Sequence, residues 1–255
     1  MSRLAVDLAR GLDPVALAGG VGMVPDVWQR ETLRSDHPRI LLNVCRQGGK
    51  SITCAVKAIH TALYEPGSLI LCLSPSLRQS GELFRKVTAS YKSLGRPVPS
   101  DAESATTLTL ENGSRVVSLP GTEATIRAYS AVRLLLVDEA ARVPDDVIAA
   151  VRPMLAVSGG QLVALSTPYG CRGWWYEAFE NGGATWERVR IPASECPRIS
   201  PEFLAEERAA LGPWFYEQEY DCQFRSAGGQ MFTEEMIGAM FSIDVQPLFP
   251  TTKGS

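Results

Sequence analysis

One short run in this 255-residue chain has the residue types of a phosphate-binding loop. In "CRQGGKS", Gly48 and Gly49 would let backbone N–H groups face a phosphate. Lys50 would reach the terminal phosphate oxygens, and the Ser51 hydroxyl suits Mg²⁺. The complete pattern, G-x-x-x-x-G-K-[ST], would place a glycine where this chain has Val44. The run alone fits two interpretations, a nucleotide site with one altered position or an ordinary surface loop.

A second run places two acids directly after four apolar residues, in "LLLVDE". If the apolar residues form a buried strand, Asp138 lies at its tip as an Mg²⁺ ligand, and Glu139 can activate the water that attacks the γ-phosphate of ATP. The alternative is a solvated turn after a strand. Because no protein-kinase catalytic loop is present, water is the expected acceptor.

A third run, "LSTP", ends another apolar segment with Ser166 and Thr167. These hydroxyls could sense the γ-phosphate or couple hydrolysis to motion, and the alternative is a Ser-Thr-Pro turn. The three runs follow one another at the ends of predicted strands. Because the carboxyl ends of parallel strands share one sheet edge, we expect their side chains to meet there.

The elements that would position these side chains alternate between strand and helix. We expect an α/β fold with a mainly parallel sheet. A type I′ turn at Asn112-Gly113 would add antiparallel strands. After about Ile191 the pattern changes to two helical segments, with Ser200 and Pro201 as N-cap and first residue. The predicted strands cover residues 39–44, 68–74, 133–141 and 161–168, and the predicted helices 51–65, 78–95, 144–157, 200–212 and 213–224.

Composition narrows the class of protein. The chain is 45% hydrophobic and 21% charged with a net charge of −3, which indicates an ordinary globular protein and disfavours a free-standing DNA binder. No signal peptide and no apolar run of 18 residues is present, so we expect a soluble, cytoplasmic protein. Six cysteines without C-x-x-C spacing predict reduced core thiols rather than a zinc site: Cys45, Cys54, Cys72, Cys171, Cys196 and Cys222.

From about Val24 to Ile237 the chain resembles the large terminase subunits of tailed bacteriophages and related viruses, the ATPase motors that package DNA. That family also uses a lysine loop without the opening glycine and often with an initial arginine, which accounts for Val44 and Arg46. The residues that carry the resemblance are "PDVWQRETL", "CRQGGKS", "LSPSLRQSGELF", "LENGSRVVSLPGTEATIRAYSAVRLLLVDEAARVP", "ALSTPYGCRGWWYEAF" and "EQEYDCQF".

The resemblance implies a role for each matching residue. Glu139 would be the catalytic glutamate, Arg127 an arginine finger acting on a neighbouring subunit, and Arg46 a sensor within its own subunit. Ala128 stands where the family commonly has glycine after the finger. Ser51 and Asp138 would hold Mg²⁺. The nucleotide would contact Gln29, which reads adenine, together with Arg46, Gln47, Gly48, Gly49, Lys50, Ser51, Ser166 and Thr167.

The resemblance also implies a P-loop NTPase fold of the RecA-like (ASCE) type, with an ATPase core at residues 1–192 and a helical lid and linker at 193–255. Full-length members carry a further nuclease domain, which this chain lacks, so nuclease activity is not expected. Expected cofactors are ATP and Mg²⁺. Expected partners are double-stranded DNA, the portal protein of the procapsid, the small terminase subunit and a homo-oligomeric ring, a pentamer when assembled and a monomer in isolation. No membrane is involved, and the place of action is the host cytoplasm.

Two other functions fit the same motifs. A DExx-type helicase fragment has Gln29, the lysine loop, the acidic pair and "STP" in similar order, but it would need a second motor domain that is not visible in this sequence. A nucleotide-gated assembly module would bind ATP and turn it over negligibly alone, because an arginine supplied by a neighbour is missing from a monomer.

Overall fold

The computed structural model describes residues 2–120 and 129–226. Arg127, the expected arginine finger, lies outside them. Within these residues the strands form one eight-stranded sheet in the order β3-β4-β5-β2-β6-β7-β1-β8. All neighbouring pairs from β5 to β8 are parallel, whereas β3 and β4 are antiparallel additions, so the predicted mixed sheet is confirmed. The strands are β1 (Arg39–Val44), β2 (Leu69–Ser74), β3 (Ser100–Glu103), β4 (Thr107–Leu110), β5 (Arg115–Pro120), β6 (Leu134–Asp138), β7 (Gln161–Ser166) and β8 (Glu187–Ile191).

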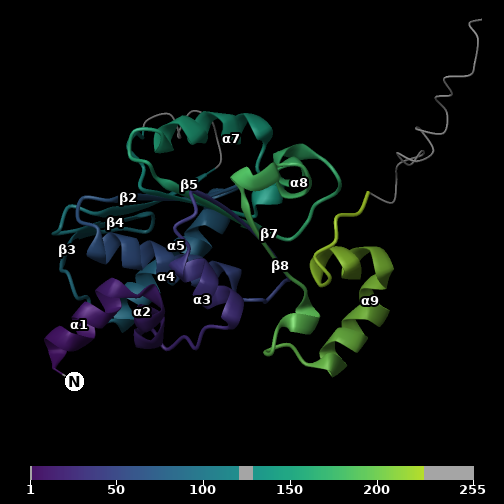
Figure 1. Cartoon of the computed structure of the whole chain (residues 1–255), viewed down its shortest axis with the longest axis horizontal. Coiled ribbons are helices and arrows are strands. Elements are labelled where there is room, and N and C mark those ends of the chain that lie inside the picture. The colour runs from purple at the N-terminus through teal and green to yellow at the C-terminus, as the bar shows by residue number, and fades with distance from the viewer. Residues whose placement is uncertain (1, 121–128, 227–255) are drawn as a thin grey trace, which may run out of the picture. The chain divides into compact units, whose positions relative to one another are not determined.

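Helices cover both faces of this sheet (Figure 1). The helices α4 and α5, with α2 and α3 beside α4, lie on one face, and α7 and α8 lie on the other. No helix in the described part of the chain has the length and apolar character needed to cross a membrane. The helices are α1 (Arg3–Leu12), α2 (Pro14–Gly20), α3 (Val27–Arg34), α4 (Lys50–Tyr64), α5 (Leu77–Ser93), α7 (Asp145–Val151), α8 (Gly173–Glu180) and α9 (Pro201–Glu219).

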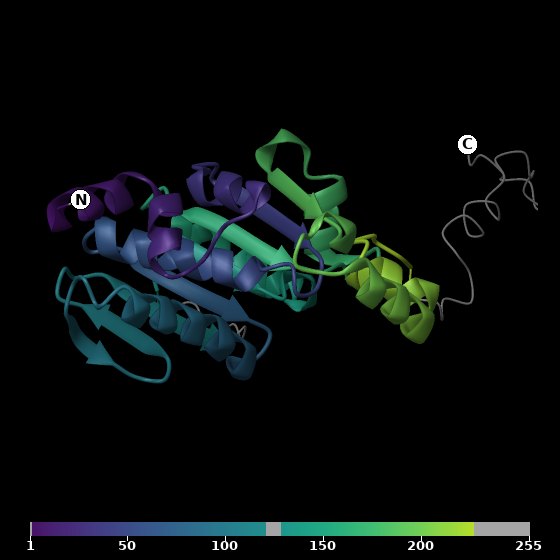
Figure 2. The same ribbon diagram turned by 90° about the horizontal axis from the view of Figure 1, so that it is seen from below.

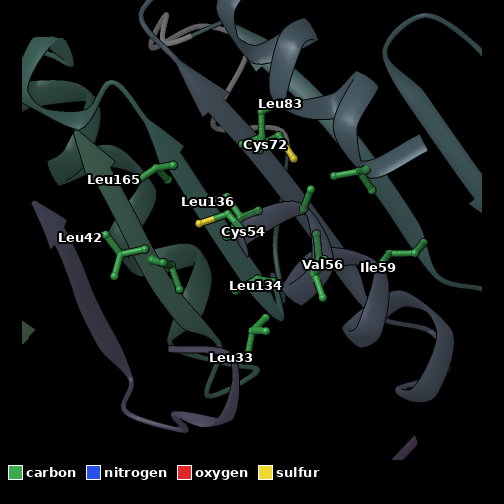
Figure 3. Packing of buried hydrophobic residues seen from close by; sticks show 14 of the residues in the cluster. Leu33, Leu42, Cys54, Val56, Ile59, Cys72, Leu83, Leu134, Leu136 and Leu165 are labelled. Carbon is green, nitrogen blue, oxygen red and sulfur yellow. The ribbon is translucent and has the colours of Figure 1, made fainter. Parts of the chain in front are cut away.

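The sheet is buried on both faces, which explains why its strands are continuous apolar runs. In β1, Ile40 and Leu42 belong to the cluster beneath α4 and α5, whereas Leu41 belongs to the cluster beneath α7 and α8. Figure 3 shows part of the first cluster, where Val56 and Ile59 of α4 lie among side chains of the strands. Two core layers therefore hold the central strands, and with them their polar ends, in fixed positions.

Two local predictions need correction. Asn112 does not adopt a positive φ, so the turn between β4 and β5 is not type I′, and only Gly113 is left-handed, with φ 84°. The Asn112 amide instead donates to the carbonyls of Ala62 and Leu63, 2.9 and 3.3 Å away, near the end of α4. The helix expected over residues 144–157 ends as α-helix at Val151 and continues as a 3₁₀ turn, because Pro153 lacks the N–H that an α-helix requires.

The segment after β8 leads into α9, which begins as the sequence predicted. The Ser200 side chain accepts from the N–H of Phe203, and Pro201 takes the first helical position. Gly212, with φ 73°, divides α9 into the two predicted helical pieces. Figure 2 shows the parallel strands running toward the side on which α9 lies. This helix therefore lies on the side where the carboxyl ends of these strands are.

Candidate active site

Four polar side chains lie at or next to the ends of four adjacent strands at the carboxyl edge of the sheet. They are Ser74 of β2, Asp138 of β6 and Ser166 of β7, each the last residue of its strand, and Asn43, the last but one of β1; all are at least nine-tenths buried. Asn43 and Ser166 are direct partners in the β1–β7 register. Ser74 Oγ, Ser166 Oγ and Asn43 Oδ1 have no hydrogen-bond partner in the described part of the chain. Because such orphaned groups are costly, this edge is built to receive further polar groups.

The lysine loop leaves this edge between β1 and α4. Val44 is fully buried as the last residue of β1, so the strand occupies the position where the complete motif has its first glycine. A Cβ on Gly48 would lie 2.6 Å from Val44 Cγ1, and Gly49 has φ 95°, so both positions require glycine. Lys50 Nζ donates to the carbonyls of Val44 and Cys45, 2.6 and 3.0 Å away, and therefore lies folded over its own loop.

The acidic pair lies at the tip of β6. Burial, and after it the charge of Glu139, raise the pKa of Asp138 to about 6. The Lys50 ammonium acts in the opposite direction and lowers the pKa of Asp138. Glu139 adopts a left-handed φ of 51°, donates its N–H to Asp138 Oδ1 at 3.0 Å and keeps a partly exposed carboxylate 3.9 Å from Arg142. One acid is thus buried and the other is partly exposed, the division that a metal ligand and a general base need.

The "STP" run is connected to the end of α9. Ser166 ends β7 and Thr167 follows it, and Thr167 Oγ1 donates to Glu219 Oε2 at 3.3 Å. The backbone carbonyl of the same Glu219 accepts from the N–H of Arg46 at 2.9 Å. The side chains of Arg46 and Gln47 are exposed. A single residue of α9 therefore contacts both the lysine loop and the third motif.

The expected adenine residue, Gln29, is almost fully buried in α3. Its Oε1 accepts from the N–H of Asp26 at 2.8 Å as half of a capping box. Its amide nitrogen would be 2.6 Å from a Cβ placed on Gly49, so the glutamine borders the lysine loop. Trp28 is buried in the core, and beside it a cavity of about 490 Å³ opens between the start of α3 and the segment after β8. Gln29 thus has a structural role and also lies beside the loop.

The structure brings the three motifs together as predicted and adds residues that the sequence did not indicate. Asn43 and Ser74 carried a weak signal, since each is a polar residue at or next to the end of an apolar run. Glu219 belongs to the "EQEYDCQF" run but was given no role, and Arg198 carried no signal, because both residues meet the loop only through folding. Arg198 donates to the carbonyl of Gly48 at 2.9 Å.

The donor set fits Mg²⁺ and does not suit a transition metal. Mg²⁺ is commonly held by one or two protein oxygens together with water and phosphates, and the Ser51 hydroxyl and the buried Asp138 carboxylate are oxygens of this kind. Among the described residues no group of three or more His, Cys, Asp and Glu side chains is arranged to hold a metal ion. All six cysteines are free; five are buried as core thiols, whereas Cys171 is only half-buried.

The fold and this edge define the class of protein. β7 lies between β1, which carries the lysine loop, and β6, which carries the acids, as expected for a P-loop NTPase of the ASCE type. A model of the family described as "Terminase large subunit, T4likevirus-type, N-terminal" matches residues 41–239. The chain belongs to this family. The match favours the terminase interpretation over the helicase interpretation. A search of curated proteins gave no significant match.

Solved structures support the same fold. The chain is similar to the large terminase ATPase domain of Thermus phage P74-26, with a TM-score of 0.72, 21% identity and coverage of 82% of this chain and 97% of that one. It is also similar to the HK97 bacteriophage large terminase, with a TM-score of 0.67, 16% identity and coverage of 84% and 55%. The ADP complex of a thermophilic bacteriophage large terminase gives a TM-score of 0.64, 13% identity and coverage of 78% and 54%. The chain spans about half the length of the last two proteins.

Proposed function

We propose that this chain binds ATP with Mg²⁺ at the carboxyl edge of its sheet, hydrolyses it there and drives double-stranded DNA into a procapsid. Membership of the large terminase family supports a viral DNA-packaging motor ATPase. A related large terminase binds ADP, which supports the proposal that this chain binds a nucleotide. The observation that carries the site is that the lysine loop, Asp138 and three polar atoms without hydrogen-bond partners in the described residues lie at one edge of the sheet.

Each motif residue has a task in this proposal. Lys50 leaves the carbonyls of Val44 and Cys45 and binds the terminal phosphates. Ser51 and Asp138 would hold Mg²⁺, which when bound neutralises charge on the phosphates. Ionised Asp138 is stabilised by a cation, so filling the site lowers its raised pKa.

Glu139 acts as the general base for the attacking water. Its carboxylate is partly exposed. Glu139 bonds to Asp138 through its backbone N–H and not through this carboxylate. A base in this position has to be ionised and within reach of a water molecule. The left-handed φ of Glu139 takes its backbone out of the extended conformation directly after Asp138, where the strand ends.

The two arginines divide between subunits. Arg46 has an exposed side chain on the loop and acts as the sensor within its own subunit. Arg127 acts on the nucleotide of a neighbouring subunit and supplies the stabilising charge of an arginine finger, an effect typically worth about 10³ to 10⁵ in rate. This assignment requires the homo-oligomeric ring, which we propose is a pentamer, and predicts a weakly active monomer.

The wider assembly follows from the same family. We propose residues 1–192 as the ATPase core and 193–255 as lid and linker, because the helical segment after β8 contacts the loop through Glu219 and Arg198. Ser166 and Thr167 would transmit the state of the phosphates to that segment. The partners of the motor are double-stranded DNA, the portal protein and the small terminase subunit.

The test is ATP turnover per subunit, measured across a range of protein concentrations with Mg²⁺ and with EDTA. We expect turnover to require Mg²⁺ and to rise steeply with concentration, because the finger comes from a neighbour. Lys50→Ala should abolish turnover. Lys92→Ala is the matched control, since Lys92 lies at the far end of α5 beside Glu103. Negligible turnover at every concentration would instead favour a nucleotide-gated assembly module.

A further inference from the structure

Arg198 connects three parts of the molecule at the lysine loop. It lies in the segment between β8 and α9, about 150 residues after the loop. One terminal nitrogen, Nη2, donates to the carbonyl of Gly48 at 2.9 Å. The other, Nη1, lies 2.8 Å from Asp26 Oδ2 at the start of α3. The guanidinium therefore joins the phosphate loop, the helix that carries Gln29 and the segment that leads into α9.

These contacts converge on one peptide group. A Cβ on Gly49 would lie 2.6 Å from the Gln29 amide nitrogen and 3.2 Å from Arg198 Nη2, so both side chains approach the same glycine. In a trans peptide the carbonyl and the following N–H point in opposite directions. With the Gly48 carbonyl held by Arg198, the Gly49 N–H is directed away from the guanidinium. The arginine thus determines which way a loop N–H donates.

The choice of arginine fits this geometry. A guanidinium presents several N–H groups in a rigid plane and can bind two acceptors at once, whereas a lysine ammonium on a flexible stem does not reproduce that arrangement. Here the two partners come from different elements: the Gly48 carbonyl accepts a hydrogen bond, and the Asp26 carboxylate forms an ion pair. Arg198 remains 45% exposed, so solvent weakens the ion pair with Asp26. Its main effect should therefore be to orient the loop rather than to stabilise the fold.

We propose that Arg198 is a positioning residue for nucleotide binding, fixing the Gly48–Gly49 peptide against Gln29 and linking it to the segment before α9. This inference rests on the proposed ATP site. It makes nucleotide affinity depend on that segment, because movement of the segment releases the Gly48 carbonyl. A second connection, from Glu219 to the N–H of Arg46, holds the other end of the loop to the same part of the chain.

The experiment measures the affinity of fluorescent ADP, and KM and kcat for ATP, in Arg198→Ala and Arg198→Lys. Loss of one charge-assisted hydrogen bond at a partly exposed site predicts a rise in Kd and KM of about tenfold for Arg198→Ala. Arg198→Lys should recover only part of it. We expect kcat at saturating ATP to change less than KM. Arg208→Ala is the matched control, since Arg208 lies on α9 and contacts Asp221 and Tyr216 instead.

A second comparison tests the connection to α3. Asp26→Asn should raise Kd by itself, and combined with Arg198→Ala it should add less than its separate effect, because the two residues act through one contact. The inference is overturned if Arg198→Ala binds ADP within about twofold of wild type, or if Arg198→Lys restores full affinity. If Arg198→Ala does not fold, the lysine variant decides between these outcomes. A wild-type protein that binds no nucleotide would instead overturn the proposed function.

Discussion

Replacing Gly49 by alanine perturbs the lysine loop in a way that can be calculated from the structure. The residue caps α4 with φ 95°, a conformation that costs an L-residue about 1–2 kcal/mol. The new Cβ would also lie 2.6 Å from the Gln29 amide nitrogen, so Gln29 has to move. That movement breaks its hydrogen bond from the Asp26 N–H, a loss of about 1 kcal/mol.

The sum is about 2–3 kcal/mol in the free energy of unfolding. For a chain of this size, each kcal/mol lowers Tm by about 2–4 °C, so we expect a decrease of about 4–12 °C. Gly22→Ala is the matched control, since Gly22 has φ 79° and nothing within 4 Å of an added Cβ. Gly22→Ala should lose only the stability that a left-handed backbone costs an alanine.

Thermal denaturation and fluorescent-ADP binding measure the two effects. We expect Gly49→Ala to melt about 2–4 °C below Gly22→Ala, the equivalent of about 1 kcal/mol, and to lose nucleotide affinity, whereas Gly22→Ala keeps wild-type affinity. If the two variants melt together and both bind ADP like wild type, the contact between Gln29 and the loop has no energetic meaning and the account of this site is wrong.

Two further substitutions test the buried Ser166 hydroxyl and the buried His60 imidazole. Ser166→Ala removes a buried hydroxyl that has no hydrogen-bond partner in the described residues, so the free energy of unfolding of the nucleotide-free protein should rise by about 1 kcal/mol, measured by calorimetry. If the hydroxyl contacts the nucleotide, ADP affinity should fall. An unchanged ADP affinity contradicts that role. Burial is the main cause that lowers the pKa of His60 from 6.5 in the folded protein. The unfolded chain therefore takes up a proton at His60 at a higher pH than the folded protein does, and stability is lost as pH falls below about 6.5. His60→Gln should therefore lose less Tm between pH 7.5 and 5.5 than wild type, and equal losses would refute the assignment.

The fold was predictable where burial controls the pattern. Central strands such as Leu69–Ser74 and Leu134–Asp138 are apolar runs ending in a polar residue, because both faces of the sheet are covered and the last side chain reaches the edge. The edge strand β8 was missed because Arg188 and Arg190 interrupt its apolar residues. The turn at Asn112 was assigned the wrong type because its side chain caps α4, a tertiary contact.

The site was predictable only in its local motifs. Lys50, Asp138 and Ser166 could be placed at one edge because parallel strands end together. The contacts of Glu219 and Arg198 with the loop join segments about 150 residues or more apart, and no local pattern encodes such a meeting. Gln29 was assigned to adenine from the resemblance alone, whereas the structure also gives it a capping role.

The central claim is that Glu139 activates water for ATP hydrolysis beside a separate metal-binding Asp138. The direct measurement is single-turnover hydrolysis by Glu139→Gln in the concentrated, Mg²⁺-loaded protein, together with its affinity for ATP and with Glu82→Gln, an exposed glutamate of α5, as control. We expect ATP to bind with near wild-type affinity and the hydrolysis rate to fall by about 10² to 10⁴. Hydrolysis at the wild-type rate in Glu139→Gln would contradict the account.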